Sequence, residues 1–231
     1  MSFIPARPRA THDFYGPVHK GLRFALAQLL IKLGACDAGD AAAVSVLMME
    51  LRLQLDLSAH HLDNEDLHVH AALESRAPGA TARLIQSHDH HRLAFEELEV
   101  LIGQVERAPA ADRAQALKRL YLRFSEFVGE DFAHMAEEEQ VILPVLQSLF
   151  TDEELAAIED QIVSALKPED MIAFGRLLIP ASTRAERLAM LQALRANAPA
   201  EAFAAILDLA ARPSLCDADW RHLAEGLELA A

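Results

Sequence analysis

Apolar residues recur along most of this chain at intervals of three and four, the spacing of one face of an α-helix. After Gly16-Pro17 such a face continues to about Leu33, and Gly34 follows it. Runs that alternate between apolar and polar residues, as half-buried strands do, are nearly absent. The chain is therefore predicted to be all-α.

Breaking and capping residues divide the first two thirds of the chain into four long predicted helices. Asp40 is placed to cap the second, and Asp112 with Gln115 has the spacing of a capping box for the fourth. The predicted helices cover residues 17–33, 41–76, 81–107 and 112–144, the last continuing a little beyond Pro144. Because the links between them are short, consecutive helices run in opposite directions, and we expect an antiparallel four-helix bundle.

Beyond Phe150 the pattern breaks into shorter segments. Two capping-box spacings begin such segments, Thr151 with Glu154 and Thr183 with Glu186. Breaks between short helices are marked by Pro168, Pro180, Pro199 and Pro213. We therefore predict two parts, a bundle over residues 12–150 and a helical C-terminal extension over residues 151–231. The extension has no fixed repeat period, and its residues assign it no role.

Charge and composition narrow the classes of function. Lys and Arg number 21 against 35 Asp and Glu, the net charge is -14, and no basic cluster occurs, so we expect no nucleic-acid partner. No apolar run approaches the roughly 20 residues that cross a bilayer, and the start lacks the apolar core of a secretory signal. We expect a cytoplasmic protein with no membrane partner, and leave homo-oligomerisation open. Cys36 and Cys216 do not form a thiolate metal motif.

Histidine is the one anomaly of the composition, because ten of the 11 histidines lie between His12 and His134. In each long predicted helix, polar residues of metal-binding type stand on the apolar face. The four inward series are His19, Leu22, Leu26, Leu29, Leu33; Leu51, Leu55, Ser58, His61, Glu65, His68, Ala72; Leu84, His88, His91, Phe95, Leu98, Ile102; and Phe124, Phe127, Asp131, His134, Glu138, Val141, Val145. His60 and Asp63 fall outside them.

A single inward histidine is most often a core residue with hydrogen-bonded ring nitrogens. Two unpaired carboxylates in an apolar core are harder to explain, because each costs several kcal/mol or is driven to protonate. No Lys or Arg stands on the same series as a partner for Glu65 or Glu138. A bound metal resolves this, and the spacing of His61 with Glu65 and of His134 with Glu138 puts each pair on one helix face.

The candidate ligands outnumber what one metal uses. They are His19, His61, Glu65, His88, His91, His134 and Glu138. Five imidazoles and two carboxylates suit two metals, and this donor set without thiolate suits iron best, with Mn or Zn possible as substitutes. The rival ferritin-like site needs two ExxH motifs; Glu65 to His68 matches one, but Asp131 stands where the second needs a Glu, and residues 17–33 hold no acid.

These motifs resemble those of the hemerythrin-like proteins, also called the HHE cation-binding domain. The match is one His on the first helix, HxxxE on the second, His88 on the third and HxxxE on the fourth, in that family's order. The flanking stretches VHKGLR, HVHAALESRAPG and HMAEEEQVILP resemble bacterial members. The resemblance covers about residues 12–150 and implies a four-helix bundle with a non-haem di-iron centre. Oxygen-carrying members differ in having HxxxH on the third helix and a more widely spaced His and Asp on the fourth.

A nitrogen-rich donor set favours the diferrous state over deep oxidation. It therefore favours a non-haem di-iron protein that binds or senses O2, NO or redox state. The alternatives are a di-iron oxidoreductase acting on peroxide or NO, an iron donor for cluster repair, and a metal buffer or structural helical module. Since His19 is the only donor of its helix, we expect one metal to face a small pocket lined by Leu22, Phe95 and Phe127.

Overall fold

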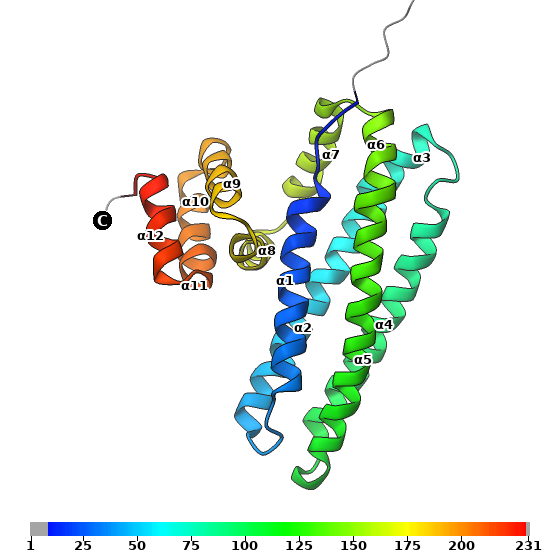
Figure 1. Cartoon of the computed structure of the whole chain (residues 1–231), viewed down its shortest axis with the longest axis vertical. Coiled ribbons are helices and arrows are strands. Elements are labelled where there is room, and N and C mark those ends of the chain that lie inside the picture. The colour runs from blue at the N-terminus through cyan, green and yellow to red at the C-terminus, as the bar shows by residue number, and fades with distance from the viewer. Residues whose placement is uncertain (1–8, 230–231) are drawn as a thin grey trace, which may run out of the picture.

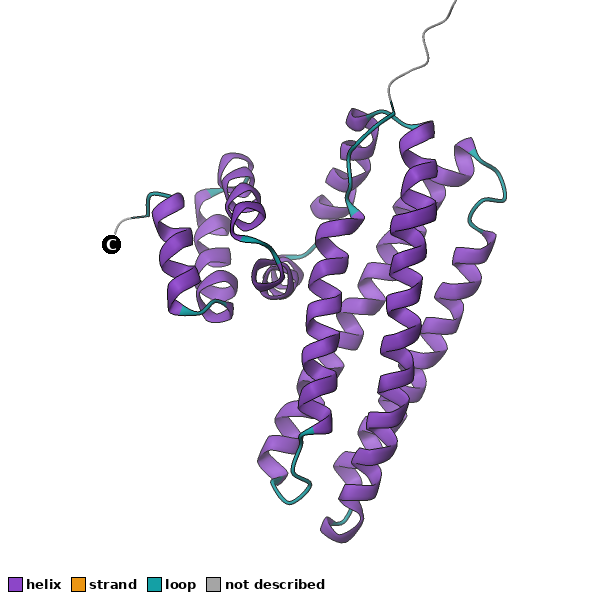
Figure 2. Ribbon diagram, viewed as in Figure 1, coloured by secondary structure: helices purple, strands orange, loops and turns teal. Residues whose placement is uncertain are grey.

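The computed structural model describes residues 9–229, and every regular element in that range is a helix (Figures 1 and 2). The all-α prediction is therefore confirmed for this part of the chain. None of its helices is both long and apolar enough to cross a membrane. The helices are α1 (Tyr15–Gly34), α2 (Ala41–Asn64), η1 (Glu65–His70), α3 (Ala71–Arg76), α4 (Ala82–Arg107), α5 (Ala110–Glu137), η2 (Glu138–Ile142), α6 (Leu143–Leu149), α7 (Asp152–Ala165), α8 (Pro168–Ala181), α9 (Arg184–Asn197), α10 (Ala200–Ile206), η3 (Leu207–Ala211), α11 (Arg212–Ser214) and α12 (Asp217–Gly226).

Two of the long helices run through a π-helical turn, labelled η. α2, η1 and α3 follow one another without a break, and so do α5, η2 and α6. These two runs, with α1 and α4, are the four long helices of the structure. They lie side by side along their length (Figure 1), with contacts between α1 and α2, α2 and α4, α4 and α5, and α5 and α1. Each long helix therefore touches two of the others.

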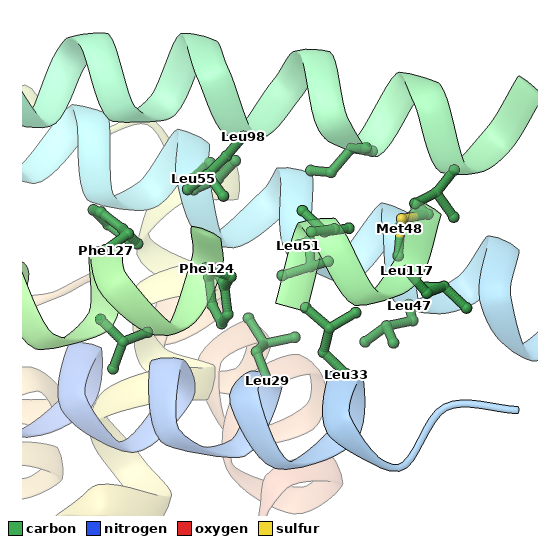
Figure 3. Close-up of a cluster of buried hydrophobic side chains, with 14 of the residues drawn as sticks. Leu29, Leu33, Leu47, Met48, Leu51, Leu55, Leu98, Leu117, Phe124 and Phe127 are labelled. Carbon is green, nitrogen blue, oxygen red and sulfur yellow. The ribbon is translucent and has the colours of Figure 1, made fainter. Parts of the chain in front are cut away.

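An apolar cluster fills the end of the long helices nearest the α1–α2 and α4–α5 links. Figure 3 shows its members converging from all four helices, among them Leu29, Leu51, Leu98 and Phe124. Burying side chains of this size stabilises the fold by about 1.5–3 kcal/mol each. The cluster therefore accounts for much of the association between the four helices at this end.

A second apolar cluster fills the opposite end of the same helices. It includes Tyr15, Val69, Leu84 and Ile142. Along every long helix, the predicted ligands stand between residues of the first cluster and residues of the second; on α1, for example, His19 lies between Tyr15 and Leu26. The polar layer is thus closed off from both ends by apolar side chains.

The π-helical turns correct the predicted inward faces beyond the two glutamates. A π turn follows an i→i+5 pattern, so the face that points inward moves by about one residue relative to an α-helix. After Glu65 the buried positions are Val69, His70 and Leu73, in place of the predicted His68 and Ala72. After Glu138 they are Ile142 and Leu146, in place of the predicted Val141 and Val145. Both corrections have the same physical cause.

Most of the predicted helix ends are confirmed. The Asp40 carboxylate accepts a hydrogen bond from the backbone N–H of Ala43, an N-cap of the kind that contributes about 0.5–2 kcal/mol. Both capping boxes of the C-terminal region are present. The capping box predicted at Asp112 is wrong, because Pro109 precedes the first turn and Asp112 already lies within it. Pro180 lies inside the last turn of α8, and Pro213 lies inside α11, which continues η3 directly, rather than between two helices.

The C-terminal region divides its contacts between two places. α7 places Leu155 and Ile158 in the second apolar cluster, so it shares a core with the long helices. The helices α9 to α12 pack with α8 around a third cluster, which includes Ile179, Leu191 and Phe203. Figure 1 shows α8 end-on between this group and α1, and α8 packs directly on α1.

A glycine allows the close approach of α8 to α1. A Cβ atom on Gly21 would lie 3.0 Å from Leu178 Cδ1 and 3.3 Å from the backbone carbon of Leu177. A larger residue at this position would push the two helices apart. The docking of the C-terminal region on the long helices therefore depends on the small size of residue 21.

Candidate metal centre

The structure gathers six of the seven predicted ligands into one buried cluster. One group of donor atoms comes from His19, His61 and Glu65, and another comes from Glu65, His88, His134 and Glu138. Within each group the atoms lie within 4.8 Å of one another. α1, α2 with η1, α4, and α5 with η2 all contribute. A buried cluster of His and Glu that could hold a metal ion is therefore present.

Glu65 lies between the two groups. Its Oε1 atom is 3.1 Å from His61 Nε2 and 3.7 Å from His19 Nε2. Its Oε2 atom is 3.6 Å from His88 Nε2. One carboxylate thus presents one oxygen to each pair of helices.

Glu138 lies between the groups in the same way. Its Oε1 atom is 3.3 Å from His134 Nε2 and 3.7 Å from His88 Nε2. Its Oε2 atom is 3.5 Å from His19 Nε2. We define the first donor group as His19, His61, Glu65 Oε1 and Glu138 Oε2, and the second as His88, His134, Glu65 Oε2 and Glu138 Oε1. The two groups share both carboxylates.

Six donor atoms of this cluster lack hydrogen-bond partners although they are buried. Unpaired atoms include His19 Nε2, His61 Nε2 and all four carboxylate oxygens of Glu65 and Glu138. A native interior leaves few such atoms, since each costs free energy when it has neither water nor a partner. His88 Nε2 and His134 Nε2 share a hydrogen bond of 3.0 Å, which a metal between them would replace. A cation between these lone pairs and carboxylates would satisfy them together, so the donor set fits a metal.

The two carboxyl groups are not equivalent in charge. Burial raises the pKa of Glu65, but the nearby His61 and His19 outweigh it and hold that pKa well below its ordinary value. Burial and the charge of Glu65 both raise the pKa of Glu138 well above its ordinary value. The pair therefore resists carrying two negative charges until a cation is close.

An outer carboxylate orients the histidine of α1. Glu139 Oε1 accepts a hydrogen bond from His19 Nδ1 at 3.0 Å. The Arg23 guanidinium holds the same carboxylate with contacts of 2.6 and 3.1 Å. Because an ionised carboxylate cannot donate, Nδ1 carries the proton, and a metal would bind the Nε2 lone pair of the ring in its neutral form. Burial lowers the pKa of His19, but Glu139 and Glu65 outweigh it and raise the pKa above its ordinary value.

A second outer carboxylate does the same for α4. Asp66 Oδ1 accepts a hydrogen bond from His88 Nδ1 at 2.8 Å, and Arg92 holds Asp66 Oδ2 at 2.6 Å. His70 stacks on the ring of His88 with 4.8 Å between ring centroids, and its Nδ1 atom lies 2.8 Å from the same Asp66 oxygen. Asp66, His70 and His88 also lie close enough to hold an ion. Because Arg92 already neutralises Asp66, we assign this trio an orienting role.

The remaining predicted ligands differ in their surroundings. His134 Nδ1 lies 3.1 Å from Ser87 Oγ, and burial lowers the pKa of His134 to about 3, so its ring is neutral at pH 7. His91 is buried with its ring centroid 4.9 Å from that of His134, but the structure does not bring it into either donor group. His91 Nε2 lies 3.9 Å from Asp131 instead. Its role as a ligand stays a prediction.

The sequence analysis did not single out Tyr15, Asp66 and Glu139 as part of the site. Tyr15 is buried with its ring centroid 5.1 Å from that of His19. The acids carry a signal in the sequence, because each directly follows the glutamate of an HxxxE motif. Each acid's arginine also stands four residues after the histidine that the acid orients, at Arg23 and Arg92. Tyr15 carries no comparable signal.

The pocket predicted beside His19, lined by Leu22, Phe95 and Phe127, stays a prediction. Phe127 is fully buried in the first apolar cluster, its ring centroid 5.5 Å from that of Phe95, and Leu22 is buried as well. A cavity of about 150 Å³ does reach the donors, but Tyr15, His61 and Glu65 line it together with apolar residues of α1, α7 and α8. Part of the wall of this cavity comes from the C-terminal region, outside the predicted lining.

Comparisons with protein-family models, with curated proteins and with solved structures found no match to this chain. The site is therefore interpreted from its own geometry and from the motifs of the sequence.

Proposed function

We propose that this chain is a hemerythrin-like protein whose four long helices form an antiparallel bundle around two iron ions, and that it binds or senses O2, NO or redox state. One observation carries the proposal: Glu65 and Glu138, both buried and without hydrogen-bond partners, each present one oxygen to each donor group. Carboxylates shared in this way suit a pair of metals better than a single one.

The choice of iron follows from the chemistry of the donors. Each donor group offers two imidazole nitrogens and two carboxylate oxygens, without thiolate. Such sets suit iron, with Mn and Zn as substitutes, and leave room for a small exogenous ligand. When bound, iron supplies affinity for a diatomic molecule and a reversible change of oxidation state.

The residues of the chain hold and orient the donors. Glu139 and Asp66 fix the ring directions of His19 and His88, and Ser87 contacts His134. Within the two donor groups only Glu65 and Glu138 offset the charge of two divalent ions, since both outer acids are paired with arginines. So few negative charges on the donors support a centre that favours the lower oxidation state, as binding or sensing requires.

One observation favours a second candidate, a di-iron oxidoreductase. The cavity of about 150 Å³ reaches His61 and Glu65 of the first donor group, so a molecule larger than O2 has room beside it. Burial argues against the iron-donor and metal-buffer alternatives, because a donor of iron has to release its metal readily. His19, His88 and Glu138 are fully buried.

Metal content tests the proposal. The full chain, loaded with Fe(II) without oxygen and desalted, should hold two iron ions, and His61→Ala or His134→Ala should lower that number sharply. His60→Ala is the matched control, since this side chain is 51% exposed and outside both donor groups. A loaded chain that holds one iron or none contradicts the proposal. Iron-loaded protein should also change its optical spectrum reversibly with O2 or NO, and sustained turnover of peroxide or NO would favour the oxidoreductase.

A further inference from the structure

We propose that the cavity beside the first donor group is a binding site for one neutral, mainly apolar organic molecule of about the size of benzene or phenol. The cavity measures about 150 Å³ and is bounded by α1, by α2 with η1, and by α7 and α8. Its place beside the metals rests on the proposed function, whereas its capacity to bind such a molecule does not.

The size and lining of the cavity define the class of ligand. Apolar side chains make most of its wall, among them Phe14, Val18, Ile162, Leu166, Phe174 and Leu178. An apolar cavity of about 150 Å³ is known to stay dry and to take up benzene. A drug-sized ligand needs at least about 300 Å³, so this cavity admits a single ring or a short branched chain.

Tyr15 gives the cavity a polar group for its ligand. This residue lines the cavity and is 1% exposed, and its hydroxyl has no hydrogen-bond partner. A buried hydroxyl without a partner costs free energy that a bound acceptor would recover. Among neutral ligands of this size, one with an oxygen atom that accepts a hydrogen bond from Tyr15 is therefore favoured.

The charges around the cavity exclude anions. Glu65 lines its inner part and Glu159 its outer part. Glu159 is paired with His12, whose Nε2 atom lies 2.8 Å from the carboxylate. Among the described residues, no Lys or Arg lines the cavity. In metal-free protein a carboxylate or phosphate would therefore meet like charge without a counter-ion, and a neutral molecule is favoured.

The C-terminal region forms part of the wall of this cavity. Ile162, Val163 and Leu166 come from α7 and its end, and Phe174 and Leu178 come from α8. Without these helices the cavity would lose much of its wall and would open to solvent beside His61. The C-terminal region thus turns an exposed face of the long helices into a partly enclosed site.

Calorimetric titration of the full chain with benzene, phenol and benzoate tests the proposal, in both metal-free and iron-loaded protein. We expect one benzene or one phenol per chain in both forms, and no saturable binding of benzoate to the metal-free protein, in which no cation offsets Glu65 and Glu159. Ile162→Trp should fill the cavity and weaken both neutral probes by about tenfold or more. Val100→Trp is the matched control, because Val100 is exposed on α4 and does not line the cavity.

Tyr15→Phe tests the polar end of the cavity. It removes the hydroxyl and keeps the ring, so phenol should bind several times more weakly while benzene binds as before. Circular dichroism and melting curves establish that each variant is folded. Equal loss of both probes, or of neither, would contradict the role of the hydroxyl.

The outcomes separate this inference from the proposed function. Absence of saturable binding of benzene and phenol by folded protein, or equal binding by Ile162→Trp, overturns the inference. Benzoate binding to metal-free protein as tightly as phenol overturns it as well. A chain that binds the probes but holds no metal contradicts the proposed function alone, and one that holds two irons but binds no probe contradicts this inference alone.

Discussion

Asp66 and Glu139 occupy equivalent positions in the two halves of the long-helix assembly. Each directly follows a buried glutamate inside a π-helical turn, and each accepts a hydrogen bond from Nδ1 of a buried histidine on another helix. Each is also held by an arginine four residues after that histidine. The acid of the α1–α2 half orients a histidine of α4, and the acid of the α4–α5 half orients a histidine of α1. Each half therefore positions a ligand of the other.

The first prediction concerns these outer acids. Asp66→Asn should lower metal affinity by about 10–100-fold, because the amide no longer fixes the proton and ring direction of His88 with an ionised acceptor. Chelator competition measures this affinity. Asp63→Asn is the matched control, since Asp63 also binds Arg92 but is 65% exposed and touches no donor. Equal effects of the two substitutions would show that Asp66 acts only through Arg92.

The second prediction concerns Glu138 in the two metal states. Glu138→Gln should raise the melting temperature of metal-free protein, because it removes a carboxyl group whose charge is disfavoured by burial and by Glu65. It should lower the melting temperature of metal-loaded protein, since it removes a metal-binding side chain and the metal stabilises only the native state. Differential scanning calorimetry of both forms measures the two shifts. Shifts of the same sign in both forms would contradict the assigned role.

The third prediction is a pH dependence of metal-free protein. Burial raises the pKa of Asp131 to about 6. Between the ordinary pKa of about 3.9 and that value the native state binds more protons than the unfolded state, so this group's contribution to stability falls as pH rises. At the linkage value of about 1.4 kcal/mol per pKa unit, the loss is of the order of 2–3 kcal/mol.

Comparison with Asp131→Asn isolates that contribution. His134, whose pKa burial lowers to about 3, has the opposite effect, since stability rises as pH increases above that value. Subtracting the unfolding free energy of the variant from that of the natural chain, measured in urea from pH 4 to 7, removes terms that both share. The difference should fall with pH, and a flat difference would mean that Asp131 has an ionic partner in solution.

The fourth prediction compares two glycines inside long helices. Gly129→Ala should stabilise the protein by about 0.5–1 kcal/mol, because alanine favours helix and a Cβ there meets nothing within 4 Å. Gly21→Ala should stabilise the protein less, or destabilise it, since its Cβ would contact Leu178 and the backbone of Leu177. Urea unfolding measures both changes, and hydrogen exchange of α8 should increase only in Gly21→Ala. Equal gains would show that α8 adjusts without cost.

The sequence pattern predicts the inward faces well as far as each glutamate and less well beyond it. His61 and Glu65, and His134 and Glu138, keep the i, i+4 spacing of an α-helix, so periodicity finds them. Beyond Glu65 and Glu138 the π turns shift the face, and no residue type in either segment marks a π turn. His70 was therefore not assigned to the inward face, although it is buried against His88.

The lining of the cavity could not be predicted from the pattern for another reason. It depends on how α7 and α8 dock, and that docking is a long-range contact that helical periodicity does not encode. Gly21 permits it, but a glycine inside a helix has many explanations when only the sequence is known. The Thr151 and Thr183 capping boxes were predicted correctly because they involve only residues three apart.

The polar layer between the two apolar clusters has a consequence for how the protein unfolds. Cooperativity requires that the ends of the long helices be coupled, and a layer of unpaired imidazoles and carboxylates couples them weakly. In metal-free protein, hydrogen exchange should therefore reveal two separate units, one around Leu51 and Phe124 and the other around Leu73 and Leu146. Metal binding should couple the two units, so that the two apolar clusters exchange as one cooperative unit.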